Sequence, residues 1–459
     1  SFPGLRISAA SRFSSLGRVL ARLTPLRSTP LLIEEPLCNN RIKRYITMPR
    51  QLVGSLDQGT SSTRFVVVDV SGRIVASAQK EHKQHYPEPG WVEHDPLEIV
   101  ECAVWCMQRV VAELKEQEDY EIVSLGITNQ RETTVIFEAA TGKPLYRAIS
   151  WNCARTQDVA TAFAREHGGP DCLRKKTGLP VASYFSATKL KWLFSEASGL
   201  NVKELRERVR RGEVLFGTMD TYLVWHLTSG ASHVTDITNA SRTLLCDVRK
   251  LQWDDELCAM WGVDKKMLPR IEPSVGGAFG VVSNKKFPFQ GVRIRCVLGD
   301  QHAASFGQRC FDEGACKATF GTGCFVMINT GKWCSSKHGL LTTPMYQIKG
   351  EPAVYALEGA VAVAGAAIQW LRDSLGFAGS ASAIGDLAMS VDDNGGVYFV
   401  PAFAGLFAPH RPEKHGFNES RPIVISPRRE TVKNGASRRA RRADSRPLKQ
   451  PCSSNHQAL

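Results

Sequence analysis

Residues 53–70, VGSLDQGTSSTRFVVVDV, contain two short apolar runs separated by a polar turn. The runs are rich in β-branched residues, which is typical of buried strands. The turn consists of Gly59 and four hydroxyl residues at 60–63, so its N–H groups and hydroxyls could bind an anion. Asp57 closes the first run, where a carboxylate suits a hydrated Mg²⁺, and Arg64 adds a positive charge. An ordinary Ser/Thr-rich hairpin is the alternative interpretation.

The chain that follows this hairpin has strand and helix patterns in turn. A third strand is predicted over residues 73–82 and a helix over 97–116, introduced by Asp95 and Pro96 as N-cap and first helical residue. A further strand is predicted over 122–130. Three antiparallel strands, a helix and another strand give a mixed sheet with a covering helix. The predicted fold class is therefore α/β.

Polar residues 129–132, NQRE, follow the strand that ends near residue 130. Loops beyond strand ends are where α/β folds bind ligands. Arg131 beside Glu132 supplies donors and acceptors for a ligand with several hydroxyls, although a surface ion pair is the alternative. Trp151 ends another strand, and it suits either a core position or a stacking platform for a polyol.

The second half of the chain repeats the organisation of the first. Asp300 and Gln301 end an apolar strand, and an Asp-Gln pair also closes the first strand of the opening hairpin. A strand pair over 316–331 then turns at residues 321–323, GTG. This echo predicts two phosphate-facing hairpins across a cleft. Residues 357–375 are expected to form a helix of small residues, suited to close approach of a nucleotide or to tight helix packing.

The net charge of +13 over 459 residues resides at the two chain ends. Residues 1–50 carry +7 and residues 410–459 carry +8, whereas residues 51–409 carry −2. We therefore expect no specific nucleic-acid partner for the folded body. The thirteen cysteines include no CxxC pair, which suits reduced thiols in a cytosolic protein better than disulfides or a zinc site. No apolar run reaches the length of a membrane span.

Both chain ends differ from the body in composition. Residues 1–47 lack Met and open with an acid-free segment rich in Arg and Ser, which is typical of a mitochondrial transit peptide. The alternative is upstream sequence, with the protein starting at Met48. From His410 onward basic residues replace hydrophobic periodicity, which predicts a disordered tail. A localisation or RNA-binding patch at residues 438–442, RRARR, is the alternative there.

Several motifs occur together in one order: DQGTSSTR, NQRET, GLPVASYFSATKLKWL, TNASRT, LGDQ, FGTGCF, LEGAVAVAGAAIQWLRD and YFVPAFAGL. They resemble the glycerol kinase branch of the sugar-kinase family over about residues 51–409. The resemblance implies the actin-like ATPase (ribonuclease H-like) fold, with two domains around a cleft. It implies an N-terminal extension at 1–50, a glycerol- and phosphate-binding domain at 51–305, a partial nucleotide-binding domain at 306–409 and a basic tail at 410–459.

The same resemblance implies ATP-dependent phosphorylation of glycerol to sn-glycerol 3-phosphate, with Asp300 as the general base. The residues implied to bind glycerol are Arg131, Glu132, Trp151, Tyr184, Asp300, Gln301 and Phe325. The residues implied to bind the nucleotide and its phosphates are Thr60, Ser61, Arg64, Thr322, Gly365 and Gln369, and Asp57 is implied to place Mg²⁺. Closure of the cleft would exclude water from the reaction.

The family sequence continues beyond residues 401–409, PAFAGLFAP, so the resemblance implies an incomplete second domain. The alternative function is a catalytically impaired isoform that binds glycerol or a partner without turnover. A kinase for another polyol and a nucleic-acid-binding protein are weaker alternatives. The implied partners are glycerol and ATP/ADP in a homo-oligomer. The implied location is the cytoplasm, with association with mitochondria as an alternative.

Overall fold

The computed structural model describes residues 49–115, 120–321, 323–361 and 363–400, together with three short strands outside these ranges. Those strands are β1 (Leu31–Ile33), β2 (Arg44–Ile46) and β22 (Ile423–Ile425). Thr322, a predicted phosphate ligand, lies outside the described residues. Most of the predicted extension at 1–50 and of the predicted tail at 410–459 lies outside them as well.

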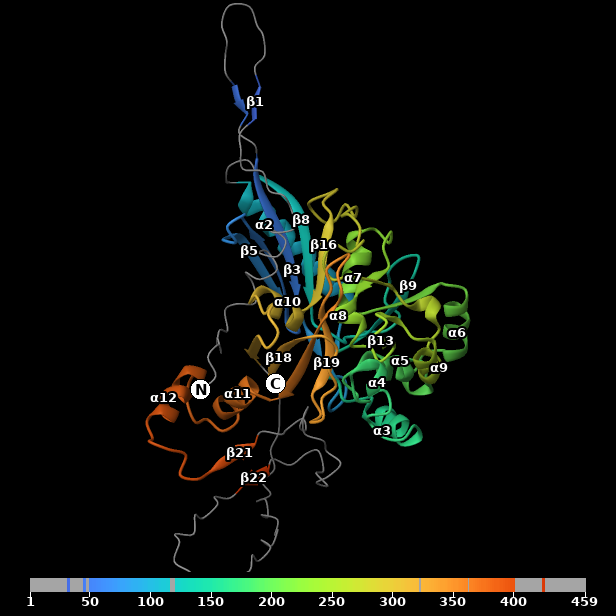
Figure 1. The fold of residues 1–459 in the computed structure, drawn as a ribbon, viewed down its shortest axis with the longest axis vertical. Coiled ribbons are helices and arrows are strands. Elements are labelled where there is room, and N and C mark those ends of the chain that lie inside the picture. Colours follow the sequence, from blue (N-terminus) through green and yellow to red (C-terminus); the bar gives the residue numbers. More distant parts are fainter. Residues whose placement is uncertain are drawn as a thin grey trace, which may run out of the picture.

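A five-stranded mixed sheet forms the centre of the molecule, in the order β16-β8-β3-β4-β5 (Figure 1). Its strands are β3 (Arg50–Gln58), β4 (Ser62–Val68), β5 (Ile74–Glu81), β8 (Tyr120–Asn129) and β16 (Ile294–Gly299). The first three pair antiparallel, whereas β8 runs parallel to both β3 and β16. The predicted mixed sheet is confirmed.

The register of the three parallel strands brings their carboxyl ends together. Gln58 pairs with Asn129, and Asn129 pairs with Gly299. Because the carboxyl ends of parallel strands meet at one edge of a sheet, the residues that follow each strand share that edge. The predicted ligand residues Arg131 and Asp300 are therefore neighbours in space, although they are 169 positions apart in the chain.

The two faces of the central sheet are covered by different elements, as the period-two alternation of β3 requires. Leu52 and Leu56 join the core formed with α2 (Pro96–Leu114) and α7 (Met219–Leu227). Val53 joins the opposite core, which includes residues of α10 (Asp300–Gly307). The predicted helix after residue 96 is confirmed, and the Asp95 side chain caps it by accepting the Leu97 N–H at 2.9 Å.

A subdomain of helices and short strands is inserted between β8 and β16 (Figure 1) and has its own core around Phe163, Leu190 and Trp261. Its helices are α3 (Gln157–Glu166), α4 (Arg174–Thr177), α5 (Ser186–Leu193), α6 (Val202–Arg210), α8 (Ile237–Ala240) and α9 (Asp255–Trp261). The strands in this stretch are β9 (Val135–Glu138), β10 (Ala148–Ile149), β11 (Val214–Gly217), β12 (Val234–Asp236), β13 (Cys246–Asp247), β14 (Gln252–Trp253) and β15 (Arg270–Glu272). Strands β6 (Gln84–His85) and β7 (Glu93–His94) pair with each other, and β7 also pairs with β10.

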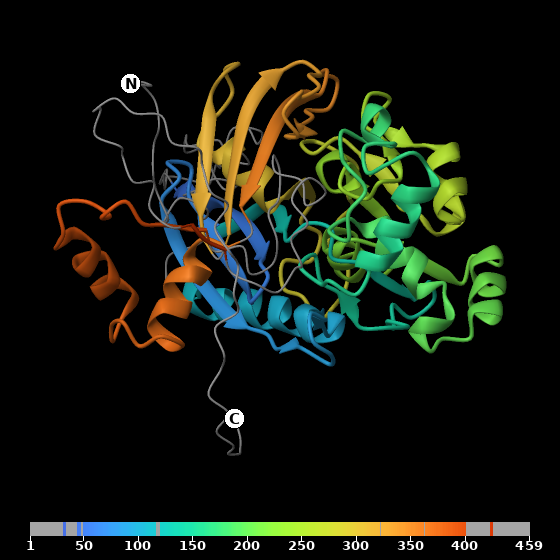
Figure 2. The same ribbon diagram turned by 90° about the horizontal axis from the view of Figure 1, so that it is seen from below.

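A second, antiparallel sheet has the order β17-β18-β20-β19 and stands on the far side of the central sheet from α2 (Figure 2). Its strands are β17 (Cys316–Phe320), β18 (Cys324–Gly331), β19 (Leu341–Tyr346) and β20 (Val354–Val361). Met327, Met345 and Ala356 from this sheet share one core with Val53 and Val66 of the central sheet. The predicted strand pair over 316–331 is confirmed.

The predicted helix over residues 357–375 is wrong in its first third. Strand β20 continues to Val361, and helix α11 begins only at Gly365 and ends at Asp373. Small Ala and Gly side chains fit a helix or a strand, so local sequence does not decide between them. Pairing of β20 with β18 on one side and β19 on the other decides for the strand. Helix α12 (Ala381–Met389) and strand β21 (Tyr398–Val400) follow.

Two further expectations concern the described part of the chain. All eleven cysteines among the described residues are free, as predicted for reduced thiols. No helix within the described ranges is long and apolar enough to cross a bilayer.

Candidate active site

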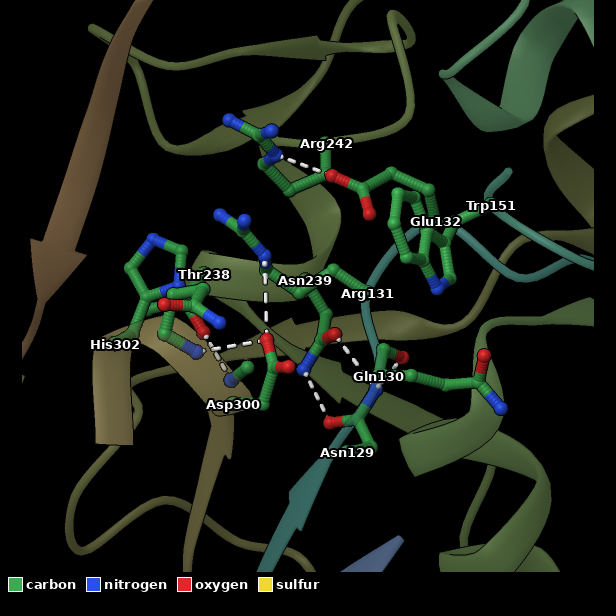
Figure 3. Close-up of polar contacts among 12 residues, drawn as sticks. Asn129, Gln130, Arg131, Glu132, Trp151, Thr238, Asn239, Arg242, Asp300 and His302 are labelled. Carbon is green, nitrogen blue, oxygen red and sulfur yellow. Dashed lines mark hydrogen bonds and ion pairs between the residues drawn. The ribbon is translucent and has the colours of Figure 1, made fainter. Parts of the chain in front are cut away.

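Asp300 and Arg131 form the centre of the candidate site at the carboxyl edge of the central sheet (Figure 3). Arg131 Nε lies 3.5 Å from Asp300 Oδ1, and the Gln301 N–H donates to the same oxygen at 2.7 Å. The Arg131 side chain is 2% exposed, whereas the Asp300 side chain keeps 24% of its surface accessible. The carboxylate is thus oriented by one hydrogen bond and one ion pair, and it is still open to a ligand.

A buried polar network behind this pair fixes the strand ends. The Gly299 N–H donates to Thr238 Oγ1 at 2.9 Å, and that hydroxyl donates to Asp236 Oδ1 at 2.9 Å. Asn239 Nδ2 donates to both Asp236 Oδ1 and Asn129 Oδ1, at 2.8 and 3.1 Å. Burial raises the pKa of Asp236, against the effect of these hydrogen bonds. Network members on α8 therefore position the ends of β8 and β16.

Glu132 has an unusual backbone conformation, with a φ of 61°. Non-glycine residues rarely adopt this left-handed region, and they do so mainly where the surrounding structure imposes it. Ser186 Oγ donates to the Glu132 carbonyl at 3.0 Å, and Arg242 Nε donates to Glu132 Oε1 at 2.5 Å. Burial raises the pKa of Glu132, and the Arg242 charge opposes that shift. The carboxylate is thus held in one orientation beside Arg131.

Glu358 of β20 connects the second sheet to the site. Arg131 donates to it in a bidentate geometry, Nη1 to Oε2 at 2.7 Å and Nη2 to Oε1 at 2.9 Å. Both Arg242 Nη atoms lie 3.4 Å from the same two oxygens. Burial alone would raise the pKa of Glu358, but the two guanidinium groups outweigh burial and hold that pKa well below its usual range. The carboxylate is therefore charged.

An aromatic wall stands beside these charges. The Trp151 ring lies edge-on to Tyr184 and Phe325, with ring centroids 5.7 and 6.2 Å apart. The Arg131 Cζ atom lies 5.9 Å from the Phe325 ring, and the Arg242 Cζ atom lies 5.5 Å from the Tyr184 ring. Burial raises the pKa of Tyr184, so its hydroxyl is neutral. Apolar faces next to fixed charges suit a small molecule with both C–H and O–H groups.

Lys189 on α5 supports this wall from within. Its Nζ donates to the carbonyls of Ser183 and Tyr184, both at 2.8 Å, and its side chain is fully buried. Burial lowers the pKa of Lys189 to about 8. These two hydrogen bonds fix the backbone that carries Tyr184 into α5.

Gln301 is buried next to Asp300 and is oriented by a second lysine. Its Oε1 accepts a hydrogen bond from Lys317 Nζ, which also donates to Thr319 Oγ1 at 2.8 Å. Both Gln301 and Lys317 are almost completely buried. Lys317 lies on β17, so the second sheet also holds this predicted glycerol ligand.

The tip of the opening hairpin is attached to its surroundings. The Gly59 N–H donates to the Ser62 carbonyl at 2.8 Å, and Trp151 Nε1 donates to Thr60 Oγ1 at 3.0 Å. Ser61 is exposed. Arg64 lies on β4 opposite Asp57 and donates from Nε to Gln79 Oε1 at 2.9 Å, so its head is directed toward β5. The tip thus lies beside the aromatic wall.

The tip of the second hairpin lies against α11. The Gly321 N–H donates to the Gly323 carbonyl at 2.9 Å, and the Gly365 N–H donates to the Gly321 carbonyl at 2.8 Å. Gln369 follows one helical turn later and is exposed. The structure therefore brings Gly365 to the second hairpin, as a nucleotide site built from both elements requires.

The predicted Mg²⁺ ligand Asp57 lies at the same sheet edge as Asp300. No cluster of three or more His, Cys, Asp or Glu side chains suited to a metal occurs among the described residues. Mg²⁺, however, is usually held by one or two carboxylates, waters and substrate phosphates. Asp57 and Asp300 lie at the ends of β3 and β16, on either side of β8. Two carboxylates at one sheet edge fit that mode of binding.

Both parts of the chain match domains of one protein family. Residues 52–307 match the N-terminal domain of the FGGY family of carbohydrate kinases, and residues 316–417 match its C-terminal domain. The chain belongs to the FGGY family. A glycerol kinase from Brucella anthropi is 48% identical over 364 residues, which cover 78% of this chain and 71% of that protein. A glycerol kinase from Roseiflexus is 48% identical over 369 residues, covering 78% and 70%.

Solved structures of carbohydrate kinases are similar to this chain as well. The crystal structure of Plasmodium falciparum glycerol kinase with ADP aligns with a TM-score of 0.74 and 36% identity, covering 83% of this chain and 74% of that one. A gluconate kinase from Lactobacillus acidophilus, with a TM-score of 0.68 and 21% identity, shares the fold. The predicted actin-like ATPase fold is confirmed for this FGGY chain. The curated relatives named here are bacterial and do not support the predicted association with mitochondria.

The structure brings together six of the predicted glycerol ligands around one site and places Gln301 beside them. Sequence reasoning did not assign roles to Arg242, Lys317 or Glu358. Each of the three stands out in this sequence. Lys317 and Glu358 are single charged residues within apolar strands, and Arg242 lies within the motif TNASRT. A lone charge in a buried strand requires a partner, but sequence alone does not identify which partner.

Proposed function

We propose that this chain is an ATP-dependent glycerol kinase that forms sn-glycerol 3-phosphate. The observation that carries the proposal is the Asp300–Arg131 pair, oriented and partly open beside the Trp151 and Phe325 rings. A three-carbon polyol presents hydroxyls to such charges and C–H groups to such rings. The identity of about 48% to proteins named glycerol kinase supports the same reaction.

Asp300 is proposed as the general base. As a hydroxyl oxygen of glycerol attacks the γ-phosphorus of ATP, the bond from that phosphorus to the β-phosphate oxygen breaks and ADP leaves. The hydroxyl proton passes to the Asp300 carboxylate. Phosphoryl transfer depends mainly on alignment and charge neutralisation. The hydrogen bond from the Gln301 N–H and the ion pair with Arg131, both at Asp300 Oδ1, would align the base.

The remaining glycerol hydroxyls are assigned to the buried polar residues. Arg131 supplies donors, Glu132 accepts, and Tyr184 and Gln301 complete the set with neutral groups. Trp151 and Phe325 contact the carbon chain. The support for these assignments is the set of contacts that orients each side chain, because an oriented group binds with a smaller loss of conformational entropy.

The nucleotide is assigned to the two hairpins and α11. Thr60 and Ser61 offer hydroxyls at the first tip, with Arg64 as a nearby charge, and Gly365 and Gln369 lie at the second. Asp57, with Asp300 across the sheet edge, would hold Mg²⁺, which neutralises charge on the transferring phosphates. On the family resemblance we also propose a homo-oligomer located in the cytoplasm.

The test is a coupled assay of ADP release by the full chain with glycerol and ATP, with the product identified by mass spectrometry. We expect glycerol-dependent ADP release and one glycerol phosphate, together with weaker activity on gluconate and xylulose. A folded protein that releases no ADP with glycerol at saturating ATP contradicts the proposal. Greater activity on a longer polyol would contradict the substrate assignment alone.

A further inference from the structure

Glu358 belongs to a chain of buried charges that crosses between the two sheets. Glu132, Arg242, Glu358 and Arg131 are each almost completely buried, and Asp300 ends the chain at the accessible edge. Glu358 is the only member on the second sheet among these five. It is paired in register with Met327 of β18 and Leu341 of β19, so the backbone that carries it is held on both sides.

The bidentate contact fixes the orientation of the Arg131 guanidinium. With Nη1 and Nη2 each donating to one Glu358 oxygen, the planar fork has one preferred orientation. In that orientation Nε lies toward Asp300 (Figure 3). A rotation of the guanidinium would break two charge-assisted hydrogen bonds, so Glu358 determines which Arg131 donors remain for a ligand.

The same carboxylate acts on Glu132 through Arg242. The Arg242 Nη atoms lie 3.4 Å from Glu358, while Arg242 Nε donates to Glu132. Two guanidinium groups this close repel each other, and a shared carboxylate offsets the repulsion. Without that negative charge, Arg131 and Arg242 would both need new partners within a buried space.

We propose that Glu358 is the positioning residue for glycerol: it orients Arg131 directly and Glu132 through Arg242, without touching the substrate. The inference rests on the proposed glycerol kinase function. Through Glu358, the geometry of the glycerol site would depend on how the second sheet packs against the central sheet. Displacement of β20 would release Arg131, and binding of glycerol to Arg131 would favour the packed arrangement.

The test compares E358Q and E358D with wild type in the full chain, by KM for glycerol, KM for ATP, kcat and thermal unfolding. Gln keeps the size and removes the charge, so we expect E358Q to raise the glycerol KM by about tenfold or more. The KM for ATP is expected to stay within about twofold, because the nucleotide is assigned to the two hairpins and α11. E358D keeps the charge with a shorter reach, and its glycerol KM falls between those of wild type and E358Q.

A matched control removes another buried carboxylate that pairs with a cation. Asp254 is 8% exposed, and both of its oxygens lie 2.9 Å from Lys176 Nζ. D254N is expected to leave both KM values unchanged and to lower only thermal stability. It therefore measures the general effect of removing the charge of a buried carboxylate, here one whose Lys176 partner is 34% exposed.

An unchanged glycerol KM in folded E358Q, or equal increases in both KM values, overturns the inference. If E358Q does not fold, E358D decides in the same way: a selective increase in glycerol KM supports the inference and an unchanged one overturns it. Wild-type activity is measured in the same assay. Absence of wild-type turnover refutes the proposed function, whereas normal wild-type turnover with unaffected variants refutes only the role of Glu358.

Discussion

The two hairpins proposed to face the phosphates share an organisation, with Gly and Thr at each tip, but they have different attachments. The first tip is bonded to Trp151 at Thr60 and to His82, whose Nε2 lies 3.1 Å from the Thr60 carbonyl. Among the described residues of the second tip, the Gly321 carbonyl accepts a hydrogen bond from the Gly365 N–H of α11. Phe320, next to that tip, is 55% exposed.

The difference indicates which half of the site is assembled before substrates arrive. The first hairpin is bonded to Trp151 of the aromatic wall, so we infer that the proposed glycerol side and the proposed first phosphate loop are held as one rigid unit. The second hairpin is bonded to α11, whose Ile368 is 37% exposed, and Leu375, just after the end of that helix, is 47% exposed. We therefore expect variants in the first region to affect glycerol and chemistry, and variants in the second to affect the nucleotide.

The largest predicted effect is loss of the base. D300N should lower kcat by roughly 10²–10⁴-fold, because an amide cannot accept the hydroxyl proton. The KM for ATP should change less than kcat, since Asp300 shares the proposed Mg²⁺ with Asp57 but is the only proposed base. The measurement is steady-state kinetics with both substrates varied.

D312N is the matched control, because Asp312 is exposed and follows the same helix. It should have wild-type kinetics. A D300N protein with more than a tenth of wild-type kcat would contradict the assignment of Asp300 as the base.

Sequence patterns predicted the first region well and the second less well, for physical reasons. The β-branched runs around Asp57 and the polar residues after β8 carry local signals, and parallel strands bring them to one edge. The Arg242–Glu358 contact joins residues 116 positions apart, and no local pattern encodes such a pairing. Residues 357–361 of β20 fit the predicted helix as well as a strand because they include small residues, and only the two neighbouring strands decide.

The second prediction concerns acid stability near the first hairpin. Burial lowers the pKa of His94 to about 3, and burial also lowers the pKa of His82, whose ring lies 5.2 Å from that of His94. A folded-state pKa below the unfolded value means that unfolding takes up a proton. The stability from neutral His94 is therefore present above pH 6.5 and is lost as pH falls toward the folded pKa.

Between pH 7.5 and 5, this group alone should remove about 2 kcal/mol of unfolding free energy. H94Q should lose less stability over the same range, although it is less stable than wild type at pH 7.5. Urea unfolding at the two pH values measures both. An equal loss in wild type and H94Q would show that His94 does not produce the acid sensitivity.

The third prediction tests the attachment of the first tip. W151F keeps an aromatic ring and removes the hydrogen bond from Nε1 to Thr60 Oγ1. A net loss of about 1 kcal/mol corresponds to an increase of about fivefold in the glycerol KM. W105F, at a 42% exposed position on α2, serves as the control and should match wild type. An unchanged KM in W151F would mean that the tip is not part of the rigid unit.

The smallest predicted effect lies in the second region. Gln369 is exposed on α11, so Q369A should raise the KM for ATP by about threefold through loss of one exposed hydrogen bond. The glycerol KM and the melting temperature should not change. Q108A on α2 provides the comparison. A selective increase in glycerol KM instead would reverse the proposed division between the two regions.

The most direct test of the central claim, that the glycerol side is assembled without nucleotide, is calorimetric titration of the full chain with glycerol alone. We predict saturable binding at one site in wild type and none in R131Q, because Arg131 is oriented by Glu358 and Asp300 before any ligand arrives. If wild type turns over glycerol yet binds none until a nucleotide is added, the site is not assembled in advance and the account is contradicted.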